Sequence, residues 1–325
     1  MSLLKGRPNG HILCVGHLCV DIISLCSTYP EEDQKVGTTT RRNRCIDQRW
    51  QRGGNAANNC TVLGLLGSKP YFCGTIAASH ERSFIMDDFA KYDVNTEYAV
   101  VHEGCECPAS CVILSEATGS RTIIHCNKDL PELAVDEFKK VNLSNFSWIH
   151  FEGRNVSNIR EIIELVREYN SSHSESQPII ISVEIEKAKP EVEVLVPLAD
   201  VIFVARDYAA YKGYTSMDDA IANIQLLAMP EATVICPWGE MGASACTGKK
   251  AIVRSPVFSP PKVIDTLGAG DTFIAATIYS LFEGKSLQES IRFGCKIAGA
   301  KVGVRGWEPL RDIITNIMHN FHAHS

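Results

Sequence analysis

The chain has 325 residues, of which 45% are hydrophobic and 22% are charged, and its formal net charge at pH 7 is −6. This ordinary globular composition excludes a disordered, collagen-like or coiled-coil chain, and the length suits two domains or one large domain with an appendage. A mildly acidic chain lacks the basic face of nucleic-acid-binding domains, so we expect no nucleic-acid partner. Arginines do gather between residues 41 and 52, and we interpret them as part of a solvated strand or loop.

The 13 cysteines indicate a reducing compartment rather than a disulfide framework. Their number is odd, many lie inside apolar runs, and the cluster Cys105, Cys107 and Cys111 lacks a second half with zinc spacing. No segment has the roughly 18 apolar residues that a membrane span needs. The apolar run 12–20 is interrupted by His17 and has no clear cleavage site after it. We therefore expect a cytoplasmic protein without a membrane partner.

In chain order, the first predicted element is a strand over residues 12–15, a continuous apolar run of the kind that parallel sheets bury on both faces. The polar stretch 28–52 follows and predicts exposed strands or a flap. The segment 53–55, Gly-Gly-Asn, then opens a predicted helix with Asn55 as its N-cap and Gly67 as its stop.

Strand and helix patterns then alternate along the chain. Further strands are expected over 71–75, 148–151, 179–183, 201–204 and 233–236, and helices over 81–92, 157–169, 217–228 and most of 268–319. This alternation predicts an α/β fold with a doubly wound parallel sheet flanked by helices. The segments 109–114 and 121–125 instead predict a hairpin, because a glycine lies in the turn between them.

The domain organisation follows from this contrast. We assign residues 11–27, 53–97 and 128–325 to the α/β core. The β-rich inserts 28–52 and 98–127 do not fit the alternation, and we expect them to form a small separate sheet that is discontinuous in sequence.

The most informative motif is the segment 265–273, Asp-Thr-Leu-Gly-Ala-Gly-Asp-Thr-Phe. An apolar helical pattern starts directly after it, so Gly268, Ala269 and Gly270 are expected at a helix N-terminus, whose free N–H groups attract phosphate. Asp271 would lie beside that anion site and could accept a hydroxyl proton. The alternative for Asp271 is a helix-start residue favoured by the dipole. The motif is neither a Walker A loop nor a dinucleotide fingerprint.

The same motif resembles the signature of the ribokinase-like pfkB carbohydrate kinases, and the segment 53–58 resembles their N-terminal Gly-Gly signature. The segments 29–33, 48–55, 115–123, 148–155 and 292–295 narrow the resemblance to the branch that phosphorylates the 1-hydroxyl of a ketohexose such as fructose. The resemblance implies a ribokinase-like fold with a β-sheet lid, also called a β-clasp. It implies ATP and Mg²⁺ as cofactors and allows for activation by K⁺. It further implies a homodimer formed through the lid sheets.

The resemblance also assigns roles to individual residues. Asp271 would be the base and the amides of Gly268, Ala269 and Gly270 the anion hole. The sugar would be held by Asp21, at the end of the first strand, by Gly54, Asn55 and Asn58, and by Asp33 of the partner subunit. Asn55 and Asn58 also lie three residues apart on one predicted helix, where they could contact one ligand. An ordinary N-cap and a solvated position are the alternatives for these two residues.

On the nucleotide side, the resemblance places Arg121 at the phosphates. The adenine pocket would be lined by Trp238, Gly239, Glu240, Gly242, Phe258, Pro260, Cys295 and Ala298, for which ordinary core packing is the alternative. Many family members carry an Asn-x-x-Glu motif near the metal, and the matching segment 204–208 lacks it. Glu184 and Glu186 are the candidates to arrange metal-bound water instead.

Three other functions remain open at this level. One is phosphorylation of a different small molecule, such as another ketose, ribose or a nucleoside. Another is a sugar-sensing pseudokinase, although Asp271, Gly268 and Gly270 are all present. A nicotinamide oxidoreductase is disfavoured because the dinucleotide fingerprint is missing.

Overall fold

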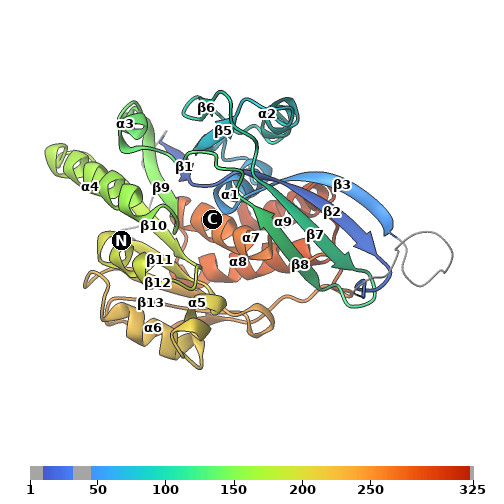
Figure 1. The fold of residues 1–325 in the computed structure, drawn as a ribbon. Helices are drawn as coiled ribbons and strands as arrows, with labels where there is room; N and C mark the ends of the chain where they lie inside the picture. The colour runs from blue at the N-terminus through green and yellow to red at the C-terminus, as the bar shows by residue number, and fades with distance from the viewer. Residues whose placement is uncertain (1–9, 32–44, 323–325) are drawn as a thin grey trace.

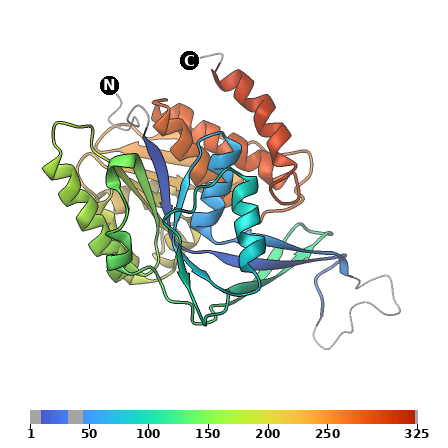
Figure 2. The same ribbon diagram turned by 90° about the horizontal axis from the view of Figure 1, so that it is seen from above.

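The computed structural model describes residues 10–31 and 45–322, which form a large α/β body and a small sheet that projects from one side of it (Figures 1 and 2). The eight-stranded sheet of the body has the order β14-β13-β12-β11-β10-β9-β1-β4. Its strands are β1 (His11–Val15), β4 (Tyr71–Cys73), β9 (Phe146–Glu152), β10 (Ile180–Ile185), β11 (Val201–Val204), β12 (Thr233–Pro237), β13 (Ala243–Thr247) and β14 (Val253–Ser255). Neighbouring strands from β4 to β12 are parallel, and β13 and β14 pair in antiparallel fashion.

The central strands are buried on both faces, as their uninterrupted apolar runs predict. In β1, Ile12 and Cys14 belong to one hydrophobic core, while Leu13 and Val15 belong to a second core on the opposite face. Side chains alternate between the two faces of a strand, so one short strand supplies both cores.

Helices cover both faces of this sheet (Figure 1). On the face of the first core lie α1 (Asn55–Leu65), α2 (Arg82–Lys91), α7 (Ala269–Phe282), α8 (Leu287–Val302) and α9 (Leu310–His322). On the other face lie α3 (Val135–Phe138), α4 (Val156–Ser172), α5 (Arg206–Tyr211) and α6 (Met217–Gln225). The predicted doubly wound arrangement is confirmed, with a mixed rather than wholly parallel sheet. Within the described ranges, no helix is long and apolar enough to cross a membrane.

The projecting sheet has four strands in the order β3-β2-β7-β8. They are β2 (Cys19–Cys26), β3 (Cys45–Gly53), β7 (Ala109–Ser115) and β8 (Arg121–Cys126). One face is anchored by a small apolar cluster of Ile23, Leu25, Val112, Leu114 and Leu267. Leu267 belongs to the loop before α7, so this contact fixes the small sheet against the segment that carries the glycine motif.

The small sheet begins earlier in the chain than expected, and three predictions need correction. Residues 19–26 form β2 of the small sheet, not part of the core segment 11–27, so Asp21 lies within β2 rather than at the end of the first strand. Residues 100–102 form β6 (Val100–His102), which pairs with β5 (Thr75–Ala77) instead of joining the small sheet. The third correction concerns Asn55, because the N-cap of α1 is Gly54.

Backbone geometry explains the cap. Gly54 has φ 95°, a conformation that side chains rarely adopt, and a Cβ there would lie 2.3 Å from the His17 carbonyl oxygen. Asn55 is therefore the first residue of α1, and its side chain does not serve as the cap of this helix. The side chain points instead into the space beside the large sheet.

Candidate active site

A cavity of about 1050 Å³ lies between the carboxyl ends of the central strands and the projecting sheet. Ligands of open α/β sheets bind at this edge. Ten of the residues singled out from the sequence line it: Asp21, Gly54, Asn55, Asn58, Arg121, Glu184, Glu186, Gly268, Gly270 and Asp271. Residues distant in sequence thus converge here from α1, α7 and the small sheet.

The glycine motif forms the N-terminus of α7, as predicted. Gly268 is its N-cap with φ 73°, and a Cβ there would lie 2.6 Å from the Trp307 ring. A Cβ on Gly270 would meet no atom within 4 Å. Gly268 is therefore required by the fold, whereas the open side of Gly270 leaves room for a ligand to approach the N–H groups of the helix start.

A buried ionic network holds this loop in place. The Asp265 carboxylate accepts hydrogen bonds from the backbone N–H groups of Leu267 at 2.9 Å and Gly306 at 3.0 Å. Lys301 Nζ lies 3.4 Å from Asp265 Oδ2 and donates to the Asp265 carbonyl at 3.2 Å, and both side chains are completely buried. Arg49 of β3 reaches the same carboxylate at 3.4 Å. The first aspartate of the motif therefore holds the glycine loop, residues 265–270, in place.

Asp271 lies in the first turn of α7, where α1 contacts it. Asn58 Nδ2 donates to Asp271 Oδ2 at 2.7 Å, and Asn59 Nδ2 donates to the Asp271 carbonyl at 3.0 Å. Burial raises the pKa of Asp271 to about 7, and the charges of Glu186 and Glu152 add to the rise, while the bond from Asn58 opposes it. A carboxylate with such a pKa is suited to accept a proton near neutral pH.

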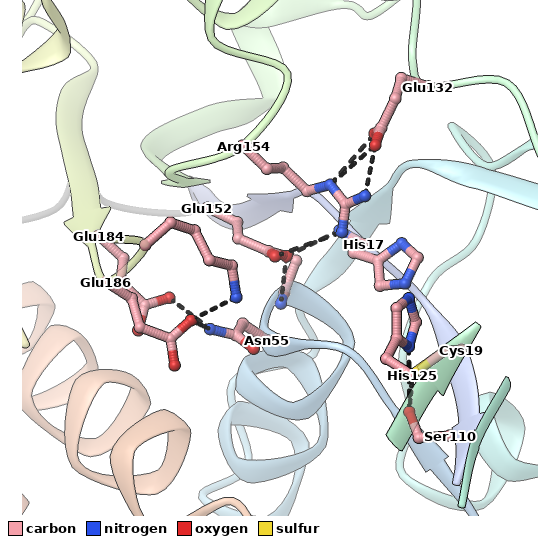
Figure 3. A network of polar contacts seen from close by, with 12 residues as sticks. His17, Cys19, Asn55, Ser110, His125, Glu132, Glu152, Arg154, Glu184 and Glu186 are labelled. Atoms are coloured by element: carbon pink, nitrogen blue, oxygen red, sulfur yellow. Dashed lines mark hydrogen bonds and ion pairs between the residues drawn. The ribbon is translucent and has the colours of Figure 1, made fainter. Parts of the chain in front are cut away.

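Carboxylates at the ends of β9 and β10 surround one side of the cavity (Figure 3). Asn55 Nδ2 donates to Glu184 Oε2 and to Glu186 Oε2, each at 3.0 Å. Burial raises the pKa of Glu184, and the charges of Glu186 and Asp271 raise it further. Such clustered oxygen atoms are the ligands that a hard divalent cation prefers.

Sequence reasoning missed Glu152 and Arg154, which line the cavity beside these carboxylates. Glu152 Oε2 accepts from the His17 backbone N–H at 2.8 Å, and Arg154 Nη1 lies 3.6 Å from Glu152 Oε1 (Figure 3). Both residues follow the apolar stretch 148–151. The rule that ligands bind at strand ends could therefore have identified them.

The small sheet closes the cavity from the other side. Asp21 of β2 is buried against Gly53, where a Cβ would lie 2.3 Å from Asp21 Oδ2. Burial raises the pKa of Asp21, and hydrogen bonds with Ser110 and Cys19 partly oppose the rise. Arg121 Nη1 of β8 donates to Thr266 Oγ1 at 2.8 Å, so the sheet reaches the glycine loop.

The predicted adenine-side residues lie outside the lining of this cavity. Ala298 and Cys295 lie on α8, and Pro260 and the Phe258 carbonyl pack against the same helix at Gly303 and Gly299. Trp238 and Glu240 lie in the turn after β12, where both contact Arg206. Gly239 and Gly242 shape that turn with positive φ angles. Pro237 is the residue of this region that reaches the cavity lining. Asp33 lies outside the described residues.

Comparison with known proteins agrees with this arrangement. A family model described as pfkB family carbohydrate kinase matches residues 9–311. Ketohexokinase of Mus musculus is 42% identical over 297 residues, covering 91% of this chain and 97% of that protein. Ribokinase of Bacillus subtilis is 24% identical over 318 residues, covering 95% of this chain and 99% of that protein. A structure of Arabidopsis thaliana ribokinase complexed with ribose and ATP matches with a TM-score of 0.76 at 20% identity, covering 95% of this chain and 98% of that one.

The chain belongs to the pfkB carbohydrate kinase family. It has the ribokinase-like fold and is a kinase, an enzyme that transfers a phosphoryl group. The resemblance to ketohexose kinases, predicted from short motifs, is confirmed across nearly the whole chain.

Proposed function

We propose that this kinase uses ATP to phosphorylate the 1-hydroxyl of a ketohexose such as fructose, giving the 1-phosphate and ADP. The observation that carries the proposal is the buried Asp271 beside the N-terminus of α7, within a cavity lined by carboxylates and amides. The similarity to ketohexokinase supports the choice of sugar.

The proposed reaction uses groups on the two sides of the cavity. Asp271 takes the proton of the attacking hydroxyl, and the N–H groups at Gly268–Gly270 stabilise negative charge on the transferred phosphoryl group. Arg121 contacts the nucleotide phosphates from the lid, because its guanidinium already lies beside the anion-binding loop at Thr266.

Polar groups suited to a polyol lie next to Asp271. Asn58 Oδ1 is a buried acceptor without a hydrogen-bond partner among the described residues. Buried polar atoms are normally paired, so a substrate hydroxyl is a fitting donor. We assign the sugar to Asp21, Gly54, Asn55 and Asn58, with Asp33 of the partner subunit completing the site. These residues do not form the aromatic-lined pocket that a nucleoside substrate would need.

The carboxylates also fit Mg²⁺, which prefers oxygen ligands and keeps several of its waters. We propose that Glu184 and Glu186 hold or orient the waters of the metal that accompanies ATP. Bound Mg²⁺ would screen the charge on the phosphates. Asn55, which donates to both carboxylates, keeps them in place beside the sugar site.

We further propose a homodimer in which the projecting sheets pack on each other. A small sheet gains stability when its apolar face is packed against another surface. The face turned away from the cavity exposes large apolar side chains: Ile46 and Trp50 on β3 and Ile124 on β8, each at least 49% exposed. A second copy would cover this surface.

The experiment that tests the function is coupled ADP release with fructose, tagatose, ribose and adenosine, followed by ³¹P NMR to locate the phosphate on the product. We expect fructose to give the highest kcat/KM and a 1-phosphate. Preference for ribose or adenosine would replace the proposed substrate, and absence of turnover with intact sugar binding would indicate a sugar-sensing pseudokinase. The same assay with Na⁺ in place of K⁺ tests activation by a monovalent cation.

A further inference from the structure

One polar cluster of the cavity has no role in the proposed reaction. His17 lies in the turn between β1 and β2, Cys19 lies on β2, and His125 lies on β8. The ligand atoms of these three side chains all lie within 4.8 Å of one another, and all three residues line the cavity. Figure 3 shows them side by side, at a distance from the carboxylates of β10.

The contacts around the cluster leave a ring nitrogen available on each imidazole, while Cys19 Sγ contacts Asp21 Oδ1 at 3.6 Å and Ser110 Oγ at 3.8 Å. His17 Nε2 is buried and has no hydrogen-bond partner within residues 10–31 and 45–322. His125 Nδ1 is hydrogen-bonded to Ser110 Oγ at 3.1 Å, which leaves its Nε2 unoccupied by that contact. The two imidazole rings lie 5.4 Å apart in an edge-on arrangement. A ligating histidine characteristically has its second ring nitrogen held in this way.

From this geometry we propose that His17, Cys19 and His125 form a binding site for a thiophilic divalent cation of the zinc class. Imidazole and thiolate are both zinc ligands, and open zinc sites have three protein ligands with a fourth position left for water or another ligand. Tetrahedral zinc needs neighbouring ligand atoms about 3.3–3.6 Å apart, so small rotations of side chains already within 4.8 Å would close the site. Magnesium prefers six oxygen ligands and does not compete for it.

The charges around the cluster are compatible with a cation. Burial lowers the pKa of His17 to about 2, so its imidazole is neutral and able to ligate. Burial and the Asp21 charge raise the pKa of the Cys19 thiol, and coordination would release this proton to solvent. The positive charges that act on His17 are those of Arg154 and Lys187. Arg154 is paired with Glu132 and Glu152, and Lys187 is paired with Glu186.

The site would also affect the sugar, a consequence that rests on the proposed function. Cys19 Sγ lies 3.6 Å from Asp21 Oδ1. A cation held by Cys19 would attract this carboxylate as its fourth ligand and withdraw it from the sugar. We therefore expect the cation and the ketose to exclude each other.

The binding test uses the whole protein without substrate. Reduced protein is titrated with Zn²⁺ against a chromogenic chelator, and with Co²⁺ while absorbance is recorded. We expect one tight site per chain and a thiolate-to-cobalt charge-transfer band. Cys19→Ser should abolish the band, and Cys19→Ser and His125→Gln should each weaken Zn²⁺ binding at least about tenfold. His125 is exposed on β8, so its variant folds even if Cys19→Ser does not.

Cys126→Ser is the matched control, because Cys126 is the exposed neighbour of His125 on the same strand and points to the opposite face. It should leave the tight site unchanged. Absence of a stoichiometric site, equal binding by wild type and both ligand variants, or loss of binding in Cys126→Ser would overturn the proposal.

The exclusion is tested in the kinase assay at buffered free Zn²⁺. Zn²⁺ should raise the KM for the ketose more than that for ATP in the wild type, and this effect should be lost in His125→Gln. An unchanged Zn²⁺ affinity in the presence of a sugar that the enzyme phosphorylates would overturn the exclusion. If no sugar is phosphorylated, the proposed function fails, while the substrate-free titration still decides the metal site.

Discussion

The α/β body and the projecting sheet differ in how they are stabilised. The strands of the body lie between two cores, and Asp271 and the glycine loop lie at the start of α7, a helix of that body. The small sheet supplies four residues to a cluster of five buried apolar residues, and every residue of β8 is exposed. Transition-state groups need fixed geometry, whereas a lid must accommodate entry and release of ligands. From this comparison we infer that the α/β body carries the groups that act on the transferred phosphoryl group. The small sheet would instead select the substrate and form the dimer contact.

The largest effect is expected on the body side. Asp271→Asn should lower kcat by about 10²–10⁴-fold with a smaller change in the KM for sugar, because the base acts mainly in the transition state. The same variant should be more stable than the wild type at pH 8. A pKa raised to about 7 means that folding disfavours the ionised carboxylate above its unfolded pKa, so wild-type stability falls as pH rises from about 4 to 7. Retained turnover would refute the assignment.

The next prediction tests whether the sheet assembles the site. Asp33→Ala should raise the KM for the ketose by about tenfold or more if a charged hydrogen bond is lost. Asp271→Asn and Asp33→Ala chains are then mixed under subunit exchange and assayed at low sugar concentration. One site of each mixed dimer would be intact, which restores at most about half of wild-type activity per dimer. No recovery despite proven exchange, or a monomer by light scattering, would contradict the dimer.

The sheet should also act on the nucleotide side. Arg121→Ala should raise the KM for ATP about tenfold, and more than the KM for sugar, because the lost contacts are with phosphate. Arg305→Ala is a suitable control, since Arg305 forms an exposed ion pair with Glu116 at 3.3 Å away from the cavity lining. A change in the sugar KM alone would show that the sheet is misassigned.

Substitutions of Gly268 and Gly270, two glycines of one loop, should have different effects on stability and on ligand binding. Gly268→Ala should destabilise the protein by about 1–3 kcal/mol, because it forces a positive φ and a contact with Trp307. Gly270→Ala meets open space, so it should leave Tm nearly unchanged while raising the KM for ATP. Thermal unfolding together with ATP titration distinguishes the two, and equal loss of stability would contradict this division.

The smallest expected effect is a shift in a pH profile. The kcat/KM for sugar should rise as pH increases through about 7, because Asp271 must be deprotonated to act as base. Glu186→Gln removes a charge that raises this pKa, so the midpoint should move to lower pH. Lys285→Gln, a substitution of a residue that does not line the cavity, serves as the control for general charge effects. An unmoved midpoint in Glu186→Gln would show that the profile reports another group.

Short-range patterns identified most of the body and the chemical motif. The helix start at Gly268, Asp271 in its first turn, and the strands 148–151 and 201–204 follow from local preferences and unbroken apolar runs. The missed strands β13 and β14 are short, and an antiparallel edge leaves no distinctive apolar run. Residues 19–26 were assigned to the α/β core, although they form β2 of the small sheet. An apolar stretch predicts a strand but not the sheet in which that strand pairs.

The amino-acid sequence was enough to predict the family, the ribokinase-like α/β fold and the glycine motif at a helix start, because each depends on residues that are neighbours in the chain. Tertiary structure alone decided which distant groups meet. It placed Glu152 and Glu186 near enough to Asp271 to raise its pKa. It also brought Lys301 into contact with Asp265 of the glycine loop, and His17 beside His125. Burial and electrostatic interaction depend on distance in space, which sequence spacing does not specify.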